Sequence, residues 1–316
     1  MLDSSQILTA VVPIFLVIVL GIVVRKLRWL TGEADKSLTT LVIYLLYPLF
    51  IVTYILGNDA LREPRNILLP PLVGFVSVVG PFGMLMYAAR CLNLGNVDEC
   101  RTFAFSNGIY NYAYFAIPIV ALLLSPETMG VLLVFNVGVE IAVWTVGVGF
   151  LLPDSGKVAL WRRVMKPPVI AILIAVPINL IHLDNAIPEP VLETVNLLGQ
   201  AAIPLGLLII GATFYDLVRG ASLFNQWQVP LASIVLRIGV LPAIFLLFAW
   251  IFPFSPELKG VLIVQAAMPC GVFPIVLARQ YGGSTSVALK AVLATTAVSI
   301  VSIPIWISYG LQLIAI

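Results

Sequence analysis

The chain has 316 residues, of which 61% are hydrophobic and 10% are charged. Soluble domains usually carry about 25% charged residues, so this chain cannot cover its apolar surface in water alone. A lipid bilayer must therefore form part of its surroundings, which excludes an ordinary soluble enzyme. The net charge of +2 comes from scattered basic residues and gives no sign of a nucleic-acid partner.

The sequence lacks the residue patterns of common catalytic and metal sites. A single histidine, His182, cannot build a histidine metal site, and the three cysteines do not form a disulfide framework. No P-loop, HExxH or GxSxG pattern is present, and the loops are too short for an ATP-hydrolysing domain. We therefore expect neither enzyme activity nor a cofactor, and any transport should be secondary or passive.

Ten apolar segments are long enough to cross a bilayer, which takes roughly 20 residues of helix. The first follows the N-terminus with no basic region before it, so we expect a retained helix rather than a cleaved signal. The predicted all-α membrane domain covers the whole chain with short loops between its spans. These spans are residues 7–25, 38–56, 67–89, 101–124, 128–152, 166–184, 198–218, 228–252, 260–280 and 285–314.

Loop charges predict how the spans are oriented. If the N-terminus lies outside the cell, thirteen basic residues fall in inside loops and three in outside loops. This bias follows the positive-inside rule and places both termini outside the cytoplasm. The inside residues are Arg25, Lys26, Arg28, Lys36, Arg90, Arg101, Lys157, Arg162, Arg163, Lys166, Arg219, Arg279 and Lys290, and the outside residues are Arg62, Arg65 and Lys259.

Ten helices divide into two halves of five, and an odd number in each half forces the halves into opposite orientations. The repeats would cover residues 1–153 and 160–316 approximately. At an offset of 156 residues, Pro118 in the fourth span aligns with Pro274 in the ninth. Pro48 and Pro204 align at the same offset in the second and seventh spans. The sequence therefore predicts an inverted repeat.

The fourth and ninth spans are predicted to be broken in mid-membrane. The fourth contains the polar sequence SNGIYN at residues 106–111, and the ninth contains MPCGVFP at residues 268–274. Paired interruptions of this kind indicate a transporter binding site, because hydrocarbon cannot pair the freed backbone groups. A simple kink is the alternative for any single proline. The residues that mark the breaks are Gly108, Pro118, Pro269, Gly271 and Pro274.

Polar side chains at these breaks are candidates for substrate contact. Asn107 and Asn111 lie four residues apart, on one face of an intact helix, and Gln265 directly precedes the second break. Tyr110 and Tyr112 offer aromatic surface and hydroxyl groups. The alternative is interhelical hydrogen bonding for the amides and packing for the tyrosines.

Two ionisable residues lie well inside predicted spans: Glu140 in the fifth and Arg237 in the eighth. A charge near the bilayer centre is costly, so such residues are functional candidates. Glu140 is a candidate carrier of a coupling proton, and Arg237 a candidate partner for an anionic substrate or for Glu140. The alternatives are a structural hydrogen-bond partner for Glu140 and snorkelling to the cytoplasmic face for Arg237.

Several segments resemble the auxin efflux carrier family of permeases along essentially the whole chain. They are ILTAVVPIF at 7–15, ADKSL at 34–38, VIYLLYP at 42–48, SNGIYN at 106–111 and AMP at 267–269, followed by LA at 277–278 and YG at 281–282. The long cytoplasmic loop of plant PIN-type carriers is absent. A short stretch around 157–166 stands in its place, which is typical of a prokaryotic permease.

The resemblance implies a fold like that of the bile-acid/sodium symporters, with the fourth and ninth helices crossing at their breaks. It implies a scaffold of helices 1, 2, 6 and 7, a transport domain of helices 3–5 and 8–10, and elevator-like movement. The implied substrates are small organic anions such as malonate or auxin-like acids. A homodimer through the scaffold helices is compatible with it. The crossover residues carried over by position are Asn107, Asn111, Gln265, Met268 and Pro269.

The leading hypothesis is therefore a secondary transporter for a small organic anion in a bacterial inner membrane, with sodium, proton or no coupling left open. One alternative is sodium-coupled symport of a larger amphipathic anion such as a bile acid. Another, from a different class, is a channel or membrane receptor.

Overall fold

The computed structural model describes residues 4–151, 164–219 and 226–314, and in these ranges the chain forms helices and no strands. The first half contains α1 (Ser4–Lys26), α2 (Gly32–Leu41), α3 (Tyr47–Ile55), α4 (Pro64–Val79), α5 (Pro81–Cys91), α6 (Val97–Gly108), α7 (Ala116–Leu123), α8 (Pro126–Ala142) and α9 (Val148–Leu151). The second half contains α11 (Pro167–Leu180), α12 (Glu189–Gln200), α13 (Ala202–Arg219), α14 (Gln228–Ser233), α15 (Leu241–Ile251), α16 (Pro256–Ala267), α17 (Phe273–Tyr281) and α18 (Thr285–Ile314).

Short π-helical and 3-10 segments join several of these helices. The π-helical segments are η1 (Val42–Leu46), η3 (Val143–Gly147) and η5 (Ile234–Val240), each continuous with α-helix on both sides. The 3-10 segments are η2 (Asp59–Arg62) and η4 (Leu183–Ala186). A π-helical turn carries one extra residue and is often found near functional sites.

Seven continuous helices are long and apolar enough to cross a membrane in the described residues. The prediction of ten spans differs from this number for three physical reasons. The fourth span is divided into α6 and α7, and the ninth into α16 and α17. The sixth is reduced to α11, which at 14 residues is about 21 Å long. The continuous spans are Gln6–Lys26, Gly32–Ile55, Pro64–Cys91, Pro126–Phe150, Glu189–Arg219, Gln228–Ile251 and Thr285–Ile314.

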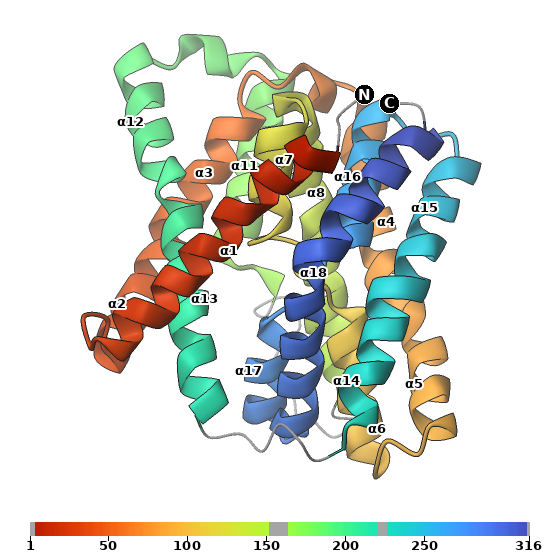
Figure 1. Cartoon of the computed structure of the whole chain (residues 1–316). Helices are drawn as coiled ribbons and strands as arrows, with labels where there is room; N and C mark the ends of the chain where they lie inside the picture. The colour runs from red at the N-terminus through yellow and green to blue at the C-terminus, as the bar shows by residue number, and fades with distance from the viewer. Residues whose placement is uncertain (1–3, 152–163, 220–225, 315–316) are drawn as a thin grey trace.

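The helices form one bundle in which elements far apart in sequence lie side by side (Figure 1). On one side α1 packs against α13, and α3 packs against α11 and α12. On the other side α4 packs against α8, and α18 packs against α14 and α16. The start of α1 and the end of α18 lie at the same end of the bundle.

Glycines let two of these helix pairs approach closely. A Cβ atom on Gly21 of α1 would lie 2.3 Å from the carbonyl oxygen of Leu208 in α13. A Cβ atom on Gly138 of α8 would lie 1.7 Å from the carbonyl oxygen of Pro71 in α4. Small residues commonly allow such backbone contact between membrane helices, where apolar burial provides little drive for association.

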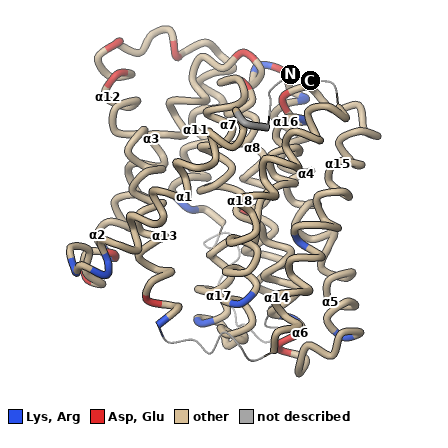
Figure 2. The backbone as a smooth tube through the Cα atoms, viewed as in Figure 1, with Lys and Arg blue, Asp and Glu red and all other residues tan. Residues whose placement is uncertain are grey.

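Most basic residues in the described ranges lie at the end of the bundle away from the termini (Figure 2). Arg25 near the end of α1 is buried and pairs with Asp35 and Asp216, which ties α1 to α2 and α13. Three residues of the charge count, Lys157, Arg162 and Arg163, lie outside the described residues. The remaining distribution has the asymmetry that the positive-inside rule describes.

Candidate functional site

The two breaks meet in the interior of the bundle. The first lies between Gly108, where α6 ends, and Ala116, where α7 begins. The second lies between Ala267, where α16 ends, and Phe273, where α17 begins. Figure 1 shows α6 and α17 toward one end of the bundle and α7 and α16 toward the other, so the two broken helices cross at their interruptions.

The crossing segments pair with each other through their backbones. Tyr110 and Cys270 form an isolated antiparallel bridge. The Asn111 N–H donates to the Pro269 carbonyl at 2.8 Å, and the Gly271 N–H donates to the Ile109 carbonyl at 2.9 Å. The breaks therefore satisfy part of each other's backbone, and fewer groups remain for a substrate than two isolated interruptions would leave.

Side chains from the neighbouring helices satisfy much of the rest. The amide nitrogens of Asn136 in α8 and of Gln265 in α16 both donate to the Tyr112 carbonyl at 3.2 Å. Gln265 Nε2 also lies 3.2 Å from Asn136 Oδ1. On the opposite side, the Cys270 N–H donates to Thr295 Oγ1 of α18 at 3.2 Å. Both breaks are thus held by a polar residue on a long membrane helix.

The two asparagines of the first break have different surroundings. Asn107 is fully buried, donates to the Phe103 carbonyl at 2.9 Å, and lies 3.5 Å from the Cys270 sulfur. Asn111 accepts from the Phe115 N–H at 3.4 Å, next to the first turn of α7. Asn107 therefore joins the two breaks, whereas Asn111 lies at the N-terminal end of a half-helix.

Arg237 belongs to η5, and its fully buried side chain reaches the C-terminal end of α16. Its Nε donates to the Met268 carbonyl at 2.8 Å, and its Nη2 donates to the Gln265 carbonyl at 3.0 Å. The guanidinium carbon is 4.8 Å from the centre of the Tyr110 ring. The Tyr110 hydroxyl in turn lies 2.6 Å from Ser77 Oγ of α4. Arg237 is therefore fixed at the second break and does not snorkel to the surface.

Glu140 is held by two donors. Its Oε1 accepts from the Tyr112 hydroxyl at 2.6 Å, and its Oε2 accepts from Trp144 Nε1 at 2.8 Å. Glu140 and Asn136 are four residues apart on α8, so one helix face contacts both the side chain and the carbonyl of Tyr112. No salt bridge within the described ranges joins Glu140 to Arg237.

Three polar atoms of the breaks and their contacts are buried without a hydrogen-bond partner in the described residues: Gln265 Oε1, an acceptor, Arg237 Nη1, a donor, and Ser106 Oγ. The N-termini of α7 and α17 both begin at the crossing and carry positive partial charge. The free donor and the helix N-termini suit an anionic group.

The remaining predicted residues also lie in or beside the breaks. Gly108 ends α6, and a Cβ atom there would lie 2.4 Å from the Phe82 ring. Pro269 and Gly271 are in the second break, and Met268 is the fully buried residue that follows α16. Pro118 and Pro274 lie in the first turns of α7 and α17, where a proline fits without breaking the helix.

The sequence analysis missed Asn136, Trp144, Ser77 and Thr295. Asn136 is a polar residue in an otherwise apolar span, one helical turn before Glu140, and this spacing was a usable signal. Ser77 and Thr295 gave no such signal, because single hydroxyl residues are common in membrane helices and usually bond to their own backbone.

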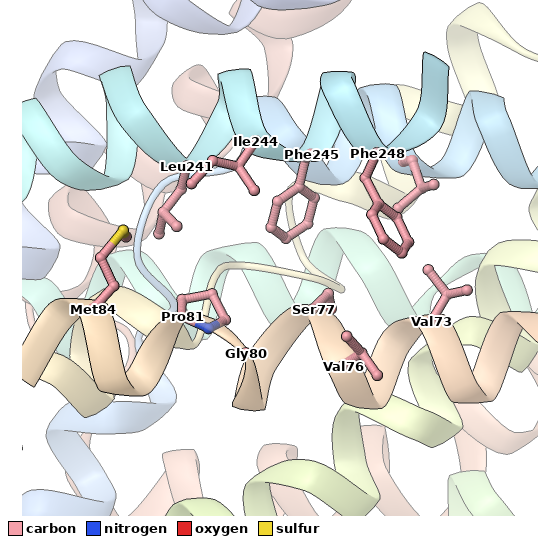
Figure 3. A pocket seen from close by; sticks show the side chains of 11 residues that line it. Val73, Val76, Ser77, Gly80, Pro81, Met84, Leu241, Ile244, Phe245 and Phe248 are labelled. Carbon is pink, nitrogen blue, oxygen red and sulfur yellow. The ribbon is translucent and has the colours of Figure 1, made fainter. Parts of the chain in front are cut away.

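An apolar pocket of about 250 Å³ lies beside the crossing, between α4, α5 and α15 (Figure 3). Leu241, Ile244, Phe245 and Phe248 of α15 face it, and Ser77 is the polar residue of its lining. Phe245 also packs against the Tyr110 ring at 5.6 Å. The Phe245 ring also lies 5.6 Å from the guanidinium carbon of Arg237, and the residues that line the pocket carry no charged group.

Comparison with known proteins finds membrane transporters. A family model described as membrane transport protein matches residues 152–307. The chain is a membrane transporter similar to the auxin efflux carriers. The resemblance seen in the sequence is thereby confirmed, and the chain is a multi-pass membrane protein and not an enzyme.

Two curated relatives are similar to this auxin efflux carrier-like transporter. An uncharacterized transporter, MJ1031, of Methanocaldococcus jannaschii is 24% identical over 302 residues, which cover 94% of this chain and 96% of that protein. Protein PIN-LIKES 1 of Arabidopsis thaliana is 26% identical over 167 residues, which cover 49% of this chain. The match spans about a third of PIN-LIKES 1, 35% of its length.

Proposed function

We propose that this protein is a secondary transporter that moves a small organic anion, a carboxylate such as malonate or an auxin-like acid, across a bacterial inner membrane. The observation that carries the proposal is the crossing of two broken helices in mid-bundle, where Arg237 Nη1 and Gln265 Oε1 are buried with no hydrogen-bond partner among the described residues. Broken helices of this kind bind the substrate in many secondary transporters.

The proposed topology has ten crossings in two inverted halves. It counts α6–α7 and α16–α17 as broken spans and α11 as a short one. The contacts are consistent with the symmetry, since α1 packs on α13 as α11 packs on α3. Likewise α6 contacts α18, and α16 contacts α8. Both ends of the chain would lie outside the cytoplasm, in keeping with the loop charges.

The proposed mechanism is an elevator. The scaffold comprises helices 1, 2, 6 and 7, which are α1, α2–α3, α11 and α12–α13, and the remaining helices carry the site. Phe15 of α1 packs against Phe115 at 5.3 Å, so the scaffold contacts the first break directly. A homodimer through the scaffold helices belongs to the same proposal. Sliding at this contact would expose the crossing to each side in turn.

Flux of labelled malonate in proteoliposomes tests the proposal. We expect saturable counterflow, which a channel would not show. Asn111→Ala should lower the flux about tenfold, since loss of one hydrogen bond to a charged ligand costs about 1.5–3 kcal/mol. Asn111→Asp keeps the oxygen that accepts from Phe115 but adds a negative charge, and should raise KM for the anion.

The control is Asn196→Ala on the exposed surface of α12, which should transport like the wild type. Unchanged flux in Asn111→Ala would remove Asn111 from the site. Large unitary currents in electrical recordings, with no counterflow, would favour a channel and contradict the proposal.

Glu140 is the proposed carrier of a coupling proton. Its carboxyl contacts Tyr112 of the first break directly, so its protonation changes a hydrogen bond at the crossing. The ionisable groups facing it are Tyr47, Tyr112 and Tyr114, together with Lys166, whose Nζ lies 5.2 Å from the centre of the Trp144 ring.

We expect an inward proton gradient to drive malonate accumulation in the wild type. Glu140→Gln should keep counterflow, because the amide can still accept from Tyr112 or Trp144, but should lose the gain from the gradient. Tyr112→Phe keeps the carboxyl and should respond to the gradient with reduced flux. Accumulation by Glu140→Gln equal to that of the wild type would contradict a coupling role.

A further inference from the structure

The C-terminal end of α16 presents carbonyl oxygens in the middle of the bundle. A helix leaves its last carbonyls without intrahelical partners, and they carry negative partial charge. In transporters with broken helices, such half-helix ends and unwound carbonyls coordinate the coupling cation. The carbonyls of Gln265, Ala266 and Met268 occupy this position here.

These carbonyls already accept hydrogen bonds from a positive group of the protein itself, the Arg237 guanidinium. Arg237 donates to Met268 at 2.8 Å, to Gln265 at 3.0 Å and to Ala266 at 3.4 Å. One guanidinium thus contacts three carbonyl oxygens at the end of one half-helix, where it is electrostatically favoured. A sodium ion would compete for the same oxygens.

The surroundings of Arg237 resemble those of a bound cation more than those of an ion pair. Within the described ranges no salt bridge joins it to a carboxylate. The rings of Tyr110 and Phe245 lie 4.8 and 5.6 Å from the guanidinium carbon. Carbonyl dipoles and aromatic faces therefore stabilise the charge, and the side chain is fully buried.

Local backbone geometry directs Arg237 inward. The residue lies within η5, the π-helical segment between α14 and α15. The extra residue of a π-helical turn rotates the helix that follows relative to the helix that precedes it. This rotation changes which side chains face the interior of the bundle. A persistent charge in a membrane helix requires such a protein environment.

We propose that Arg237 is a resident cation in place of a coupling sodium ion, so that anion transport by this protein is independent of sodium. This inference deepens the proposed function and rests on it, because sodium independence has meaning only if the protein transports the anion. The guanidinium keeps Nη1 as a buried donor, so the same fixed charge is available to the carboxylate of the anion.

Thermal unfolding of purified protein tests the cation position without reference to transport. Arg237→Ala removes the guanidinium from the three carbonyls, of which that of Gln265 still accepts the Met268 N–H at 3.3 Å. We expect a lowered Tm that rises saturably with millimolar guanidinium or sodium, because a ligand that binds only the folded state stabilises it by mass action. Wild type and Arg90→Ala, altered at an exposed arginine in the last turn of α5, should show no such rise.

Arg237→Lys is the conservative variant. A compact ammonium reaches fewer carbonyls than a planar guanidinium, so we expect partial loss of Tm and a smaller response to added cation. If Arg237→Ala cannot be purified, this variant carries the same test. Absence of any cation-dependent rise in both variants would overturn the assignment of this position.

Malonate counterflow in sodium and in choline medium provides the second arm. We expect the wild type to transport equally in both media, and Arg237→Ala to recover flux when guanidinium or sodium is added. Sodium-dependent flux in the wild type would overturn the proposal. No malonate flux in either medium would count against the proposed function alone, because the Tm measurements would still decide whether Arg237 occupies a cation site.

Discussion

Alanine in place of Gly138 should destabilise the protein by about 2–3 kcal/mol, since overpacking a close contact costs this much. The added Cβ would lie 1.7 Å from the carbonyl oxygen of Pro71 and 2.5 Å from the carbonyl carbon of the same residue. Both atoms are backbone, so no side chain can rotate to relieve the clash. The α4–α8 pair would have to separate, and with it the face of α8 that carries Asn136 and Glu140.

Tm and the yield of folded protein in detergent measure this effect. The matched control is Gly149→Ala in α9, where an added Cβ meets nothing within 4 Å. Its stability should stay within about 0.5 kcal/mol of the wild type, as for most substitutions at open positions. Equal stability of the two variants would contradict the close packing of α4 on α8.

Alanine in place of Asn136 should lower malonate flux about tenfold to a hundredfold while leaving much of the fold intact. Asn136 donates to the Tyr112 carbonyl and accepts from Gln265, so its loss frees groups of both breaks at once. A buried polar group left without its partner costs about 1–3 kcal/mol, which corresponds to this range of rates.

A double-mutant cycle with Gln265→Ala separates this network from two independent contacts. Because Asn136 and Gln265 bond to each other and to one carbonyl, the double variant should be little worse than the poorer single variant. Additive losses of flux would show that the two amides act separately, and would contradict the network described at the crossing.

Hydropathy alone placed the long spans well, because a helix such as α18 is continuous over Thr285–Ile314 and predominantly apolar, with one lysine, Lys290. The positions of the breaks could also be predicted from the sequence, since Gly108, Pro269 and Gly271 are residues that weaken or end a helix within otherwise apolar spans. The seven continuous spans and the divided fourth and ninth segments agree with those local signals.

The partners at the breaks were not predictable from local sequence. We expected the breaks to leave many backbone groups open, but Asn111 and Gly271 close part of them through pairing between distant segments. The position of Arg237 depends on the packing of α16 against α15 and on the π-helical turn that contains it. Such long-range pairings depend on tertiary contacts, which helical periodicity does not encode.

The central claim is that the anion binds where the two broken helices cross. A crystal structure with a brominated carboxylate that competes with malonate tests it most directly, because the anomalous signal of bromine locates the ligand. We predict a bromine position in contact with Asn111 and Gln265, near Arg237 Nη1. A bromine position confined to the apolar pocket between α4, α5 and α15, with none at the crossing, would contradict the account.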